Sequence, residues 1–322
     1  MLILLWKELD FKLNWFYFSF FLIIPAVGQS CAFADNGYSF VENIGSHGSG
    51  DGQFNVPHSL TFDRDGNMYV TDTSNNRIQK FSSDGKFLMT WGSRGSGDGQ
   101  FSGPEGIDVN SEGGIYVADT GNSRIQKFTT DGKFITKWGS KGSDEGEFSI
   151  HAHGIAIDSF DNVYVTDRFN HNIQKFTSDG KFITKWGSKG TDNGEFIEPH
   201  SSAIDSSDNV YVSDMRNYRI QKFTSDGKFI TKWGSKGALD GQFILPLGID
   251  IDSHGNVYVV DRGTSSIQQF SNTGTYLPPR LLLGEYERRD SSILEDLEID
   301  RYDNVYLTDR ENHNIKKFII TE

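Results

Sequence analysis

Histidine and glutamate side chains recur at one position of a repeating unit in this chain. Three of the eight histidines and two glutamates occupy that position: His58, Glu105, His153, His200 and Glu295. Imidazole and carboxylate groups around an open position are the ligands of zinc, iron and manganese sites. The set predicts one divalent transition metal such as zinc, if the fold brings these distant residues together. A channel lined by solvated polar side chains is the alternative.

The repeating unit that carries these residues occurs six times. Its repeated aspartates are 47 or 48 residues apart, at Asp72, Asp119, Asp167, Asp214, Asp261 and Asp309. Each copy has four short apolar runs separated by turns, in the third copy His153–Asp158, Asn162–Asp167, Asn172–Phe176 and Lys181–Trp186. This period is typical of a β-propeller, so we expect an all-β fold of six four-stranded blades. The first strand of a blade is innermost, which places the histidine and glutamate column around the channel. The aspartate present in every blade is expected to bond to the backbone at a loop start.

The two ends of the chain predict how the ring closes. The sixth copy ends with its third run, Ile315–Ile320, and the missing fourth run precedes the first copy at residues 38–44. We expect 38–44 to supply the outer strand of the last blade and to remove an open sheet edge. In the fifth blade, Tyr276–Ser292 contains Pro278 and Pro279 and lacks the Trp-Gly-Ser of other blades. Its outer strand is therefore expected to be short or irregular.

The first 34 residues have a different composition. Trp15–Val27 is an uncharged apolar run, followed by Ala32 and Ala34 in a small-x-small pattern. This layout predicts an export signal over residues 1–34, cleaved after Ala34, and a secreted propeller over 35–322. An uncleaved segment would instead anchor the protein in a membrane. The chain has a single cysteine, at position 31, so the mature protein has no disulfide.

Charge and three arginines indicate the kind of partner. The formal net charge is −13, which makes nucleic acid an unlikely partner, because nucleic-acid binding needs a basic face. Arg168, Arg262 and Arg310 each follow a repeated aspartate. Since strand direction alternates within a blade, these side chains are expected on the same rim as the histidines. They are candidates for binding a small anionic or carboxylate ligand. Pairing with neighbouring acids is the alternative.

The repeats resemble the NHL family. The matching phrases in the first copy are Phe54–Leu60, Asn67–Asp72 and Asn75–Phe81, and the resemblance extends over residues 38–322. It implies a six-bladed propeller that serves as a protein- or RNA-binding platform, or, in one branch, a metal-dependent lyase. The family's ubiquitin ligases carry a Cys/His-rich zinc domain upstream, which this chain lacks, so that activity does not carry over.

The lyase branch cleaves peptidyl-hydroxyglycine and is similar in the segment Val56–Leu60. By that resemblance, His58, His153 and His200 would be zinc ligands and Arg168 would contact substrate. The family's essential tyrosine lies two residues after a repeated aspartate. None of the six matching positions is tyrosine here: Ser74, Gly121, Phe169, Arg216, Gly263 and Glu311.

The sequence contains no complete catalytic constellation, so enzymatic activity is left open. The favoured interpretation is an exported propeller, monomeric, that binds a protein, a peptide or a small anionic ligand on its channel face. The alternative is a metal-dependent lyase or hydrolase with its site at the channel mouth.

Overall fold

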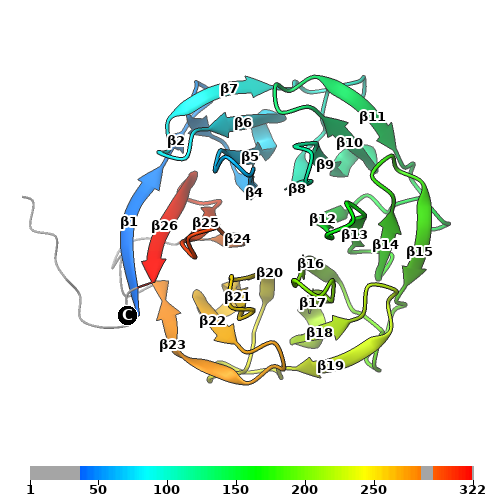
Figure 1. Cartoon of the computed structure of the whole chain (residues 1–322), viewed down its shortest axis with the longest axis vertical. Coiled ribbons are helices and arrows are strands. Elements are labelled where there is room, and N and C mark those ends of the chain that lie inside the picture. The colour runs from blue at the N-terminus through cyan, green and yellow to red at the C-terminus, as the bar shows by residue number, and fades with distance from the viewer. Residues whose placement is uncertain (1–36, 284–292, 321–322) are drawn as a thin grey trace, which may run out of the picture. The chain divides into compact units, whose positions relative to one another are not determined.

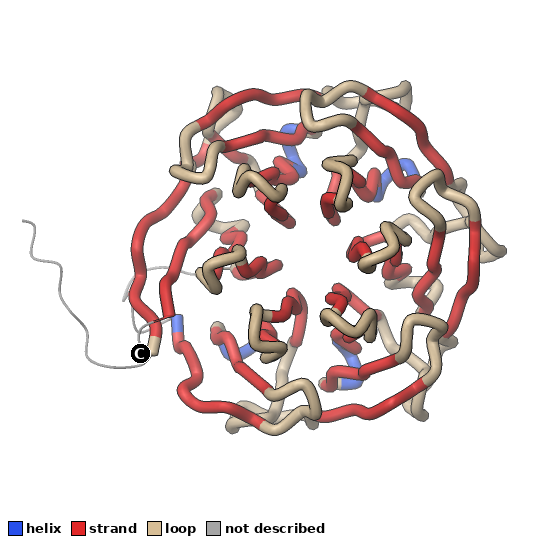
Figure 2. Tube along the Cα trace, in the orientation of Figure 1, coloured by secondary structure: helices blue, strands red, loops and turns tan. Residues whose placement is uncertain are grey.

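A computed structural model describes residues 37–283 and 293–320, all within one compact unit. These residues form the six-bladed propeller that the repeats predict, and the four strands of each blade follow one another from the central channel to the rim (Figure 1; Figure 2). The predicted export signal lies outside the described residues. Among those described, no helix is long and apolar enough to cross a bilayer.

The blades follow one another in chain order. Blade 1 contains β4 (Pro57–Phe62), β5 (Met68–Asp72), β6 (Arg77–Phe81) and β7 (Phe87–Trp91). Blade 2 contains β8 (Pro104–Val109), β9 (Ile115–Asp119), β10 (Arg124–Phe128) and β11 (Phe134–Trp138). Blade 3 contains β12 (Ala152–Ile157), β13 (Val163–Asp167), β14 (Asn172–Phe176) and β15 (Phe182–Trp186). Blade 4 contains β16 (Pro199–Ile204), β17 (Val210–Asp214), β18 (Arg219–Phe223) and β19 (Phe229–Trp233).

The last two blades and the short elements complete the ring. Blade 5 contains β20 (Pro246–Ile251), β21 (Val257–Asp261), β22 (Ser266–Phe270) and β23 (Tyr276–Leu282). Blade 6 contains β24 (Leu294–Ile299), β25 (Val305–Asp309), β26 (Asn314–Ile320) and β1 (Tyr38–Ile44). The short elements are β2 (Ser46–His47), β3 (Gln53–Phe54) and the 3-10 turns η1 (Thr73–Asn75), η2 (Thr120–Asn122), η3 (Met215–Asn217) and η4 (Arg262–Thr264).

The ring closes as the sequence predicts. β1 pairs antiparallel with β26, with Tyr38 opposite Ile320 and Ile44 opposite Ile315. The last blade therefore joins both ends of the described chain, with β1 on its outer edge (Figure 1). This pairing covers the edge that β26 would otherwise expose.

The outer strand of blade 5 is irregular, which is one of the two outcomes that its prolines predict. β23 is not short, since it spans seven residues, but its pairing with β22 is irregular, with a register shift between Ile267 and Gln269. The strand also supplies Arg280, whose guanidinium donates to Ser266 Oγ at 2.8 Å and to the Ala238 carbonyl at 2.7 Å. In blades 1, 2 and 4 an arginine at the start of the third strand donates to carbonyls of the preceding loop: Arg77, Arg124 and Arg219. In blade 5 that position is Ser266, and Arg280 supplies the guanidinium from the neighbouring strand.

The hydrophobic core consists of layers between neighbouring blades. One such layer joins Tyr164 and Ile173 of blade 3 to Phe196, Val212 and Phe223 around blade 4, all fully buried. Burial of each such side chain contributes about 1.5–3 kcal/mol. A blade thus buries its faces only against its neighbours, which explains why the repeats require a closed ring.

The repeated aspartate has the structural role expected of it. Asp119 is fully buried and accepts hydrogen bonds from Ser102 N at 2.8 Å, Arg124 Nε at 2.7 Å and Gln126 Nε2 at 3.0 Å. His171 of blade 3 also contacts the next blade, because its Nδ1 accepts the backbone N–H of Glu198 at 3.1 Å. These contacts satisfy polar backbone groups of the loops, so the loops do not depend on the channel side chains for their hydrogen bonds.

Candidate metal centre at the channel mouth

A bulge in each innermost strand turns the histidine and glutamate column toward the channel. In blade 1, Pro57 pairs with Asp72 and Leu60 pairs with Val70. Two residues of the inner strand, His58 and Ser59, therefore lie opposite the single residue Thr71. The same shift occurs in all six blades. A bulge bends the strand and re-aims its side chains. The position that the sequence singles out is therefore the place where each inner strand departs from regular pairing.

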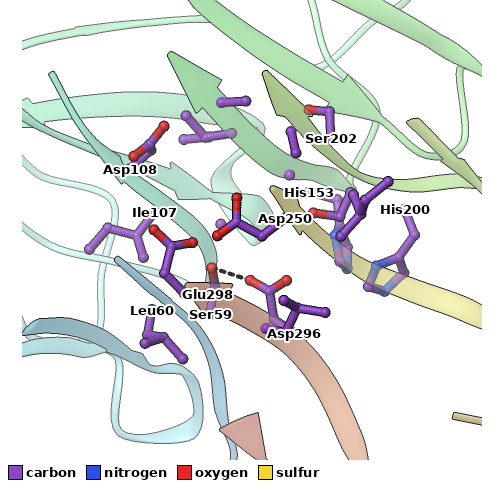
Figure 3. Close-up of a pocket in the computed structure, with 18 of the residues that line it drawn as sticks. Ser59, Leu60, Ile107, Asp108, His153, His200, Ser202, Asp250, Asp296 and Glu298 are labelled. Carbon is purple, nitrogen blue, oxygen red and sulfur yellow. Dashed lines mark hydrogen bonds between the residues drawn. The ribbon is translucent and has the colours of Figure 1, made fainter. Parts of the chain in front are cut away.

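Four of the five predicted ligands converge. His58, His153, His200 and Glu295 are buried, and one ligand atom from each lies within 4.8 Å of the others. His58 Nε2 and His200 Nε2 lie 3.4 and 3.3 Å from the same oxygen, Glu295 Oε1. The His153 and His200 rings are 3.9 Å apart between centroids and lie side by side at one end of the pocket (Figure 3).

These distances fit a metal-binding set. Metal–ligand bonds of about 2.0–2.1 Å in a tetrahedral site place neighbouring ligand atoms about 3.3 Å apart. The two imidazole–carboxylate distances match this spacing between ligand atoms. They are longer than the usual N–H···O hydrogen bond of about 2.7–3.2 Å. In addition, the Nδ1 atoms of His58 and His200 are buried without a hydrogen-bond partner among the described residues. An unpartnered buried polar atom costs free energy, which a bound ligand or water would recover.

The surroundings favour the neutral form of His153 and His200 and the charged form of Glu295, but they favour the protonated form of His58, which would have to lose its proton to bind a metal. Burial lowers the pKa of His200, and burial with the neighbouring His200 lowers that of His153 well below its usual value. For Glu295, burial is outweighed by hydrogen bonds from His200 and His58, so its pKa lies well below the usual range. Burial also opposes the charge on His58, but the Glu295 hydrogen bond and the charge of Glu105 raise the His58 pKa overall. Neutral imidazoles beside a charged carboxylate are the forms that bind metal.

Glu105 does not join the four converging residues. Its Oε2 lies 3.6 Å from His153 Nε2 and 3.7 Å from His151 Nδ1. Sequence analysis missed His151, although the His-x-His of blade 3 is visible in the chain. Glu105 thus lies beside one predicted ligand and a second histidine of the same loop.

The rim arginines pair with acids, which is the alternative that the sequence left open. Arg262 Nη1 and Arg310 Nη1 lie 3.4 and 3.2 Å from Glu295 Oε2. Arg168 Nη2 lies 2.7 Å from Glu198 Oε2. Glu295 therefore presents one oxygen to two imidazoles and the other to two guanidiniums. About a third of the Arg262 and Arg310 side chains stays exposed, which leaves donors for a ligand at the channel mouth.

A second group of carboxylates lies deeper in the same channel. The pocket, of about 120 Å³, continues from His153 and His200 to Asp108, Asp250, Asp296 and Glu298 (Figure 3). Burial raises the pKa of Asp108 and of Asp250 to about 7. Sequence analysis missed these acids, although Asp108, Asp250 and Glu298 all lie three residues after the histidine and glutamate column. The channel thus has a charged mouth and a deeper section whose carboxyl groups retain protons near neutral pH.

Parts of the chain match models of known protein families. The NHL repeat family model matches residues 54–81, 101–128 and 243–270, and a model described as a 6-bladed beta-propeller matches residues 159–220. NHL repeat-containing protein 3 is similar over 48 residues, with 46% identity in Homo sapiens and 44% in Mus musculus. That segment spans 15% of this chain and 14% of each relative.

Solved structures share the architecture. A streptogramin B lyase structure superposes with a TM-score of 0.62 at 15% identity, over 89% of this chain and 100% of the other. Virginiamycin B lyase from Staphylococcus aureus gives 0.63 at 15% identity, over 88% of this chain and 100% of the other. The gluconolactonase XC5397 from Xanthomonas campestris gives 0.62 at 13% identity, over 84% and 88%. At these identities the likeness concerns the fold alone, that of a six-bladed β-propeller. The chain is thus a six-bladed propeller that contains NHL repeats at the three matched segments.

Proposed function

We propose that this protein binds one divalent first-row transition metal at the channel mouth and acts there on a small anionic ligand as a lyase or hydrolase. The observation that carries the proposal is the convergence of three imidazoles and one carboxylate within 4.8 Å. Borderline nitrogen and carboxylate ligands suit zinc, manganese or iron.

The roles of the side chains follow from their contacts. His58, His153, His200 and Glu295 would hold the metal, which would supply Lewis-acid or water-activating chemistry. Arg262 and Arg310 hold the Glu295 carboxylate in place through Oε2, as an outer shell does for a metal ligand. Their exposed N–H groups face the ligand and favour an anion. The solved lyases and the gluconolactonase that share the fold are consistent with this class of activity.

Metal analysis of the purified protein tests the proposal. After reconstitution with zinc, manganese or iron(II), we expect about one bound ion per chain by mass spectrometry. A double variant with His58→Ala and His200→Ala should lose that ion and keep its circular dichroism spectrum, because channel side chains are outside the blade core. The matched control is His254→Ala, a histidine whose side chain is 75% exposed. Absence of stoichiometric metal from the parent protein would rule the proposal out.

A second candidate function is a protein-binding scaffold. The outer strands of blades 1 to 4 each expose one aliphatic side chain at the same position, with exposed fractions of 44–49%: Leu88, Ile135, Ile183 and Ile230. This regular apolar belt favours a protein partner on the circumference. A photo-crosslinking residue at Ile183 should then capture one discrete protein in the native source, whereas the same residue at the exposed Phe160 should not. Equal capture at both positions would contradict the scaffold function.

A further inference from the structure

A second cavity lies at the seam between the first and the last blade, away from the channel histidines. It has a volume of about 500 Å³, and three basic residues line it, Arg64, Arg301 and Lys317. The seam is where the chain closes on itself, between β4 and β24–β26 (Figure 1). Volumes of this size hold small organic ligands.

The seam differs from the other junctions between blades in what its lysine contacts. In blades 2, 3 and 4, the equivalent lysines donate to a turn carbonyl of the next blade: Lys127 to Ser178 at 3.1 Å, Lys175 to Ser225 at 3.3 Å and Lys222 to Asn272 at 3.3 Å. The corresponding acceptor at the seam would be Ser83, which lines the cavity. The one contact that the described structure gives the Lys317 ammonium is with the Tyr306 ring, 5.2 Å from its centroid. The junction is therefore left open at this lysine.

The arginines at the seam also keep donors free. Arg64 and Arg301 are exposed, and Arg301 uses one nitrogen to donate to the Arg64 carbonyl at 2.8 Å. The described structure gives neither guanidinium a carboxylate partner.

The acids that line the cavity offset only part of this charge and form their hydrogen bonds elsewhere. Asp63 accepts from Asn67 Nδ2 and from the Tyr69 hydroxyl, each at 2.9 Å. Asp300 accepts from Asn304 Nδ2 at 2.8 Å and from the Tyr306 hydroxyl at 3.2 Å. Glu298, at the inner wall, has a pKa well above its usual value because of burial and of the nearby Asp250 and Asp108. The lining therefore sets three cations against the two aspartates, with Glu298 favoured in its protonated form, which leaves a small excess of positive charge.

We propose that the seam cavity binds a small organic anion, with a carboxylate or phosphate head at Arg64, Arg301 and Lys317 and an apolar body against Phe62 and Tyr306. The Phe62 and Tyr306 rings lie 4.7 Å apart between centroids and form the apolar wall. Guanidinium groups bind planar and tetrahedral oxyanions through paired N–H donors, and an ammonium adds a point charge. None of the four converging channel residues lines this cavity, although Glu298 lines both pockets.

Calorimetric titration with phenyl phosphate tests the site, with benzyl alcohol as the neutral analogue. We expect one phenyl phosphate per chain, binding that weakens with added salt, and no detectable binding of benzyl alcohol. Arg301→Gln, on an exposed turn, and Lys317→Gln should each weaken binding by at least about tenfold. The control Lys133→Gln, whose lysine lies on an exposed hairpin, should bind as the parent does.

Three results would overturn the proposal. The first is absence of binding at millimolar phenyl phosphate, and the second is unchanged affinity in Arg301→Gln and Lys317→Gln. The third is loss of binding in the His58→Ala, His200→Ala double variant, which would place the anion in the channel. Retention of binding in that double variant supports the seam site whether or not the protein holds a metal.

Discussion

Replacement of Asp108 by asparagine should make the protein more stable, and the gain should grow with pH. Asp108 lies in the deeper part of the channel, where its Oδ1 accepts from Val109 N at 2.7 Å and from Thr61 Oγ1 at 3.1 Å. Burial raises its pKa from 3.8 to about 7. Between these values the folded state binds more protons than the unfolded state, so stability falls as pH rises through that window. Asparagine keeps an acceptor for Val109 and Thr61 but removes the ionisation.

The size of the effect follows from the two pKa values. A difference between 3.8 and about 7 corresponds to at most about 4 kcal/mol. Because Asp108 lines a cavity that admits water, we expect about half, ~2 kcal/mol, at pH 8. The gain should approach zero below pH 4 and level off above pH 7. For a domain of this size, ~2 kcal/mol corresponds to an increase in Tm of roughly 4–8 °C.

Urea unfolding at pH 4, 6 and 8 in the presence of EDTA measures this effect. The matched control is Asp131→Asn, which removes an exposed carboxylate. Hydrogen bonds from Lys133 and Thr129 lower the pKa of Asp131. That control should show no gain at pH 8. A gain that does not depend on pH, or a loss at pH 8, would show that Asp108 is ionised in the folded protein and refute the reasoning.

Two further predictions concern the N-terminal part of the chain. Protein recovered from outside the cell should begin at Asp35 by N-terminal sequencing, whereas an intact Met1 or an exclusively cytosolic protein would contradict export. Deletion of residues 35–45 should expose the edge of β26 and cause aggregation or a large loss of stability, seen by light scattering and thermal unfolding. A truncated protein that melts like the full-length mature chain would show that β1 does not close the ring.

The fold was predictable from the sequence because the period is strict. The repeated aspartates give the number of blades, and the missing fourth run of the last copy shows that residues 38–44 supply the closing strand. The irregular pairing of the blade 5 outer strand was predictable from its two prolines, but its length was not. Two prolines argue for a short strand, but an outer strand pairs on one side only, which tolerates a register shift, and Arg280 restores the missing contact.

The candidate site was predictable as a column of positions but not as a set of contacts. Alignment of the repeats finds His58, His153, His200, Glu105 and Glu295 together, because all lie on the innermost strands. It cannot distinguish Glu295, which reaches the imidazoles, from Glu105, which lies beside His153 and His151. That distinction depends on the direction of each side chain within a ring of six, which spacing does not encode.

The repeats themselves indicate where function resides in this propeller. Positions that hold the blades together are nearly invariant within the chain: the aspartate after the second strand is present six times, as is the buried tyrosine of that strand. The channel position is instead His, Glu, His, His, Leu and Glu. Six equivalent positions around an axis cannot form an asymmetric site unless their residues differ. The residue therefore varies at this bulged position, where the blade-forming positions do not. Glu295 also binds imidazoles through one oxygen and guanidiniums through the other. Both observations identify the channel mouth as the most specialised part of an otherwise repetitive structure.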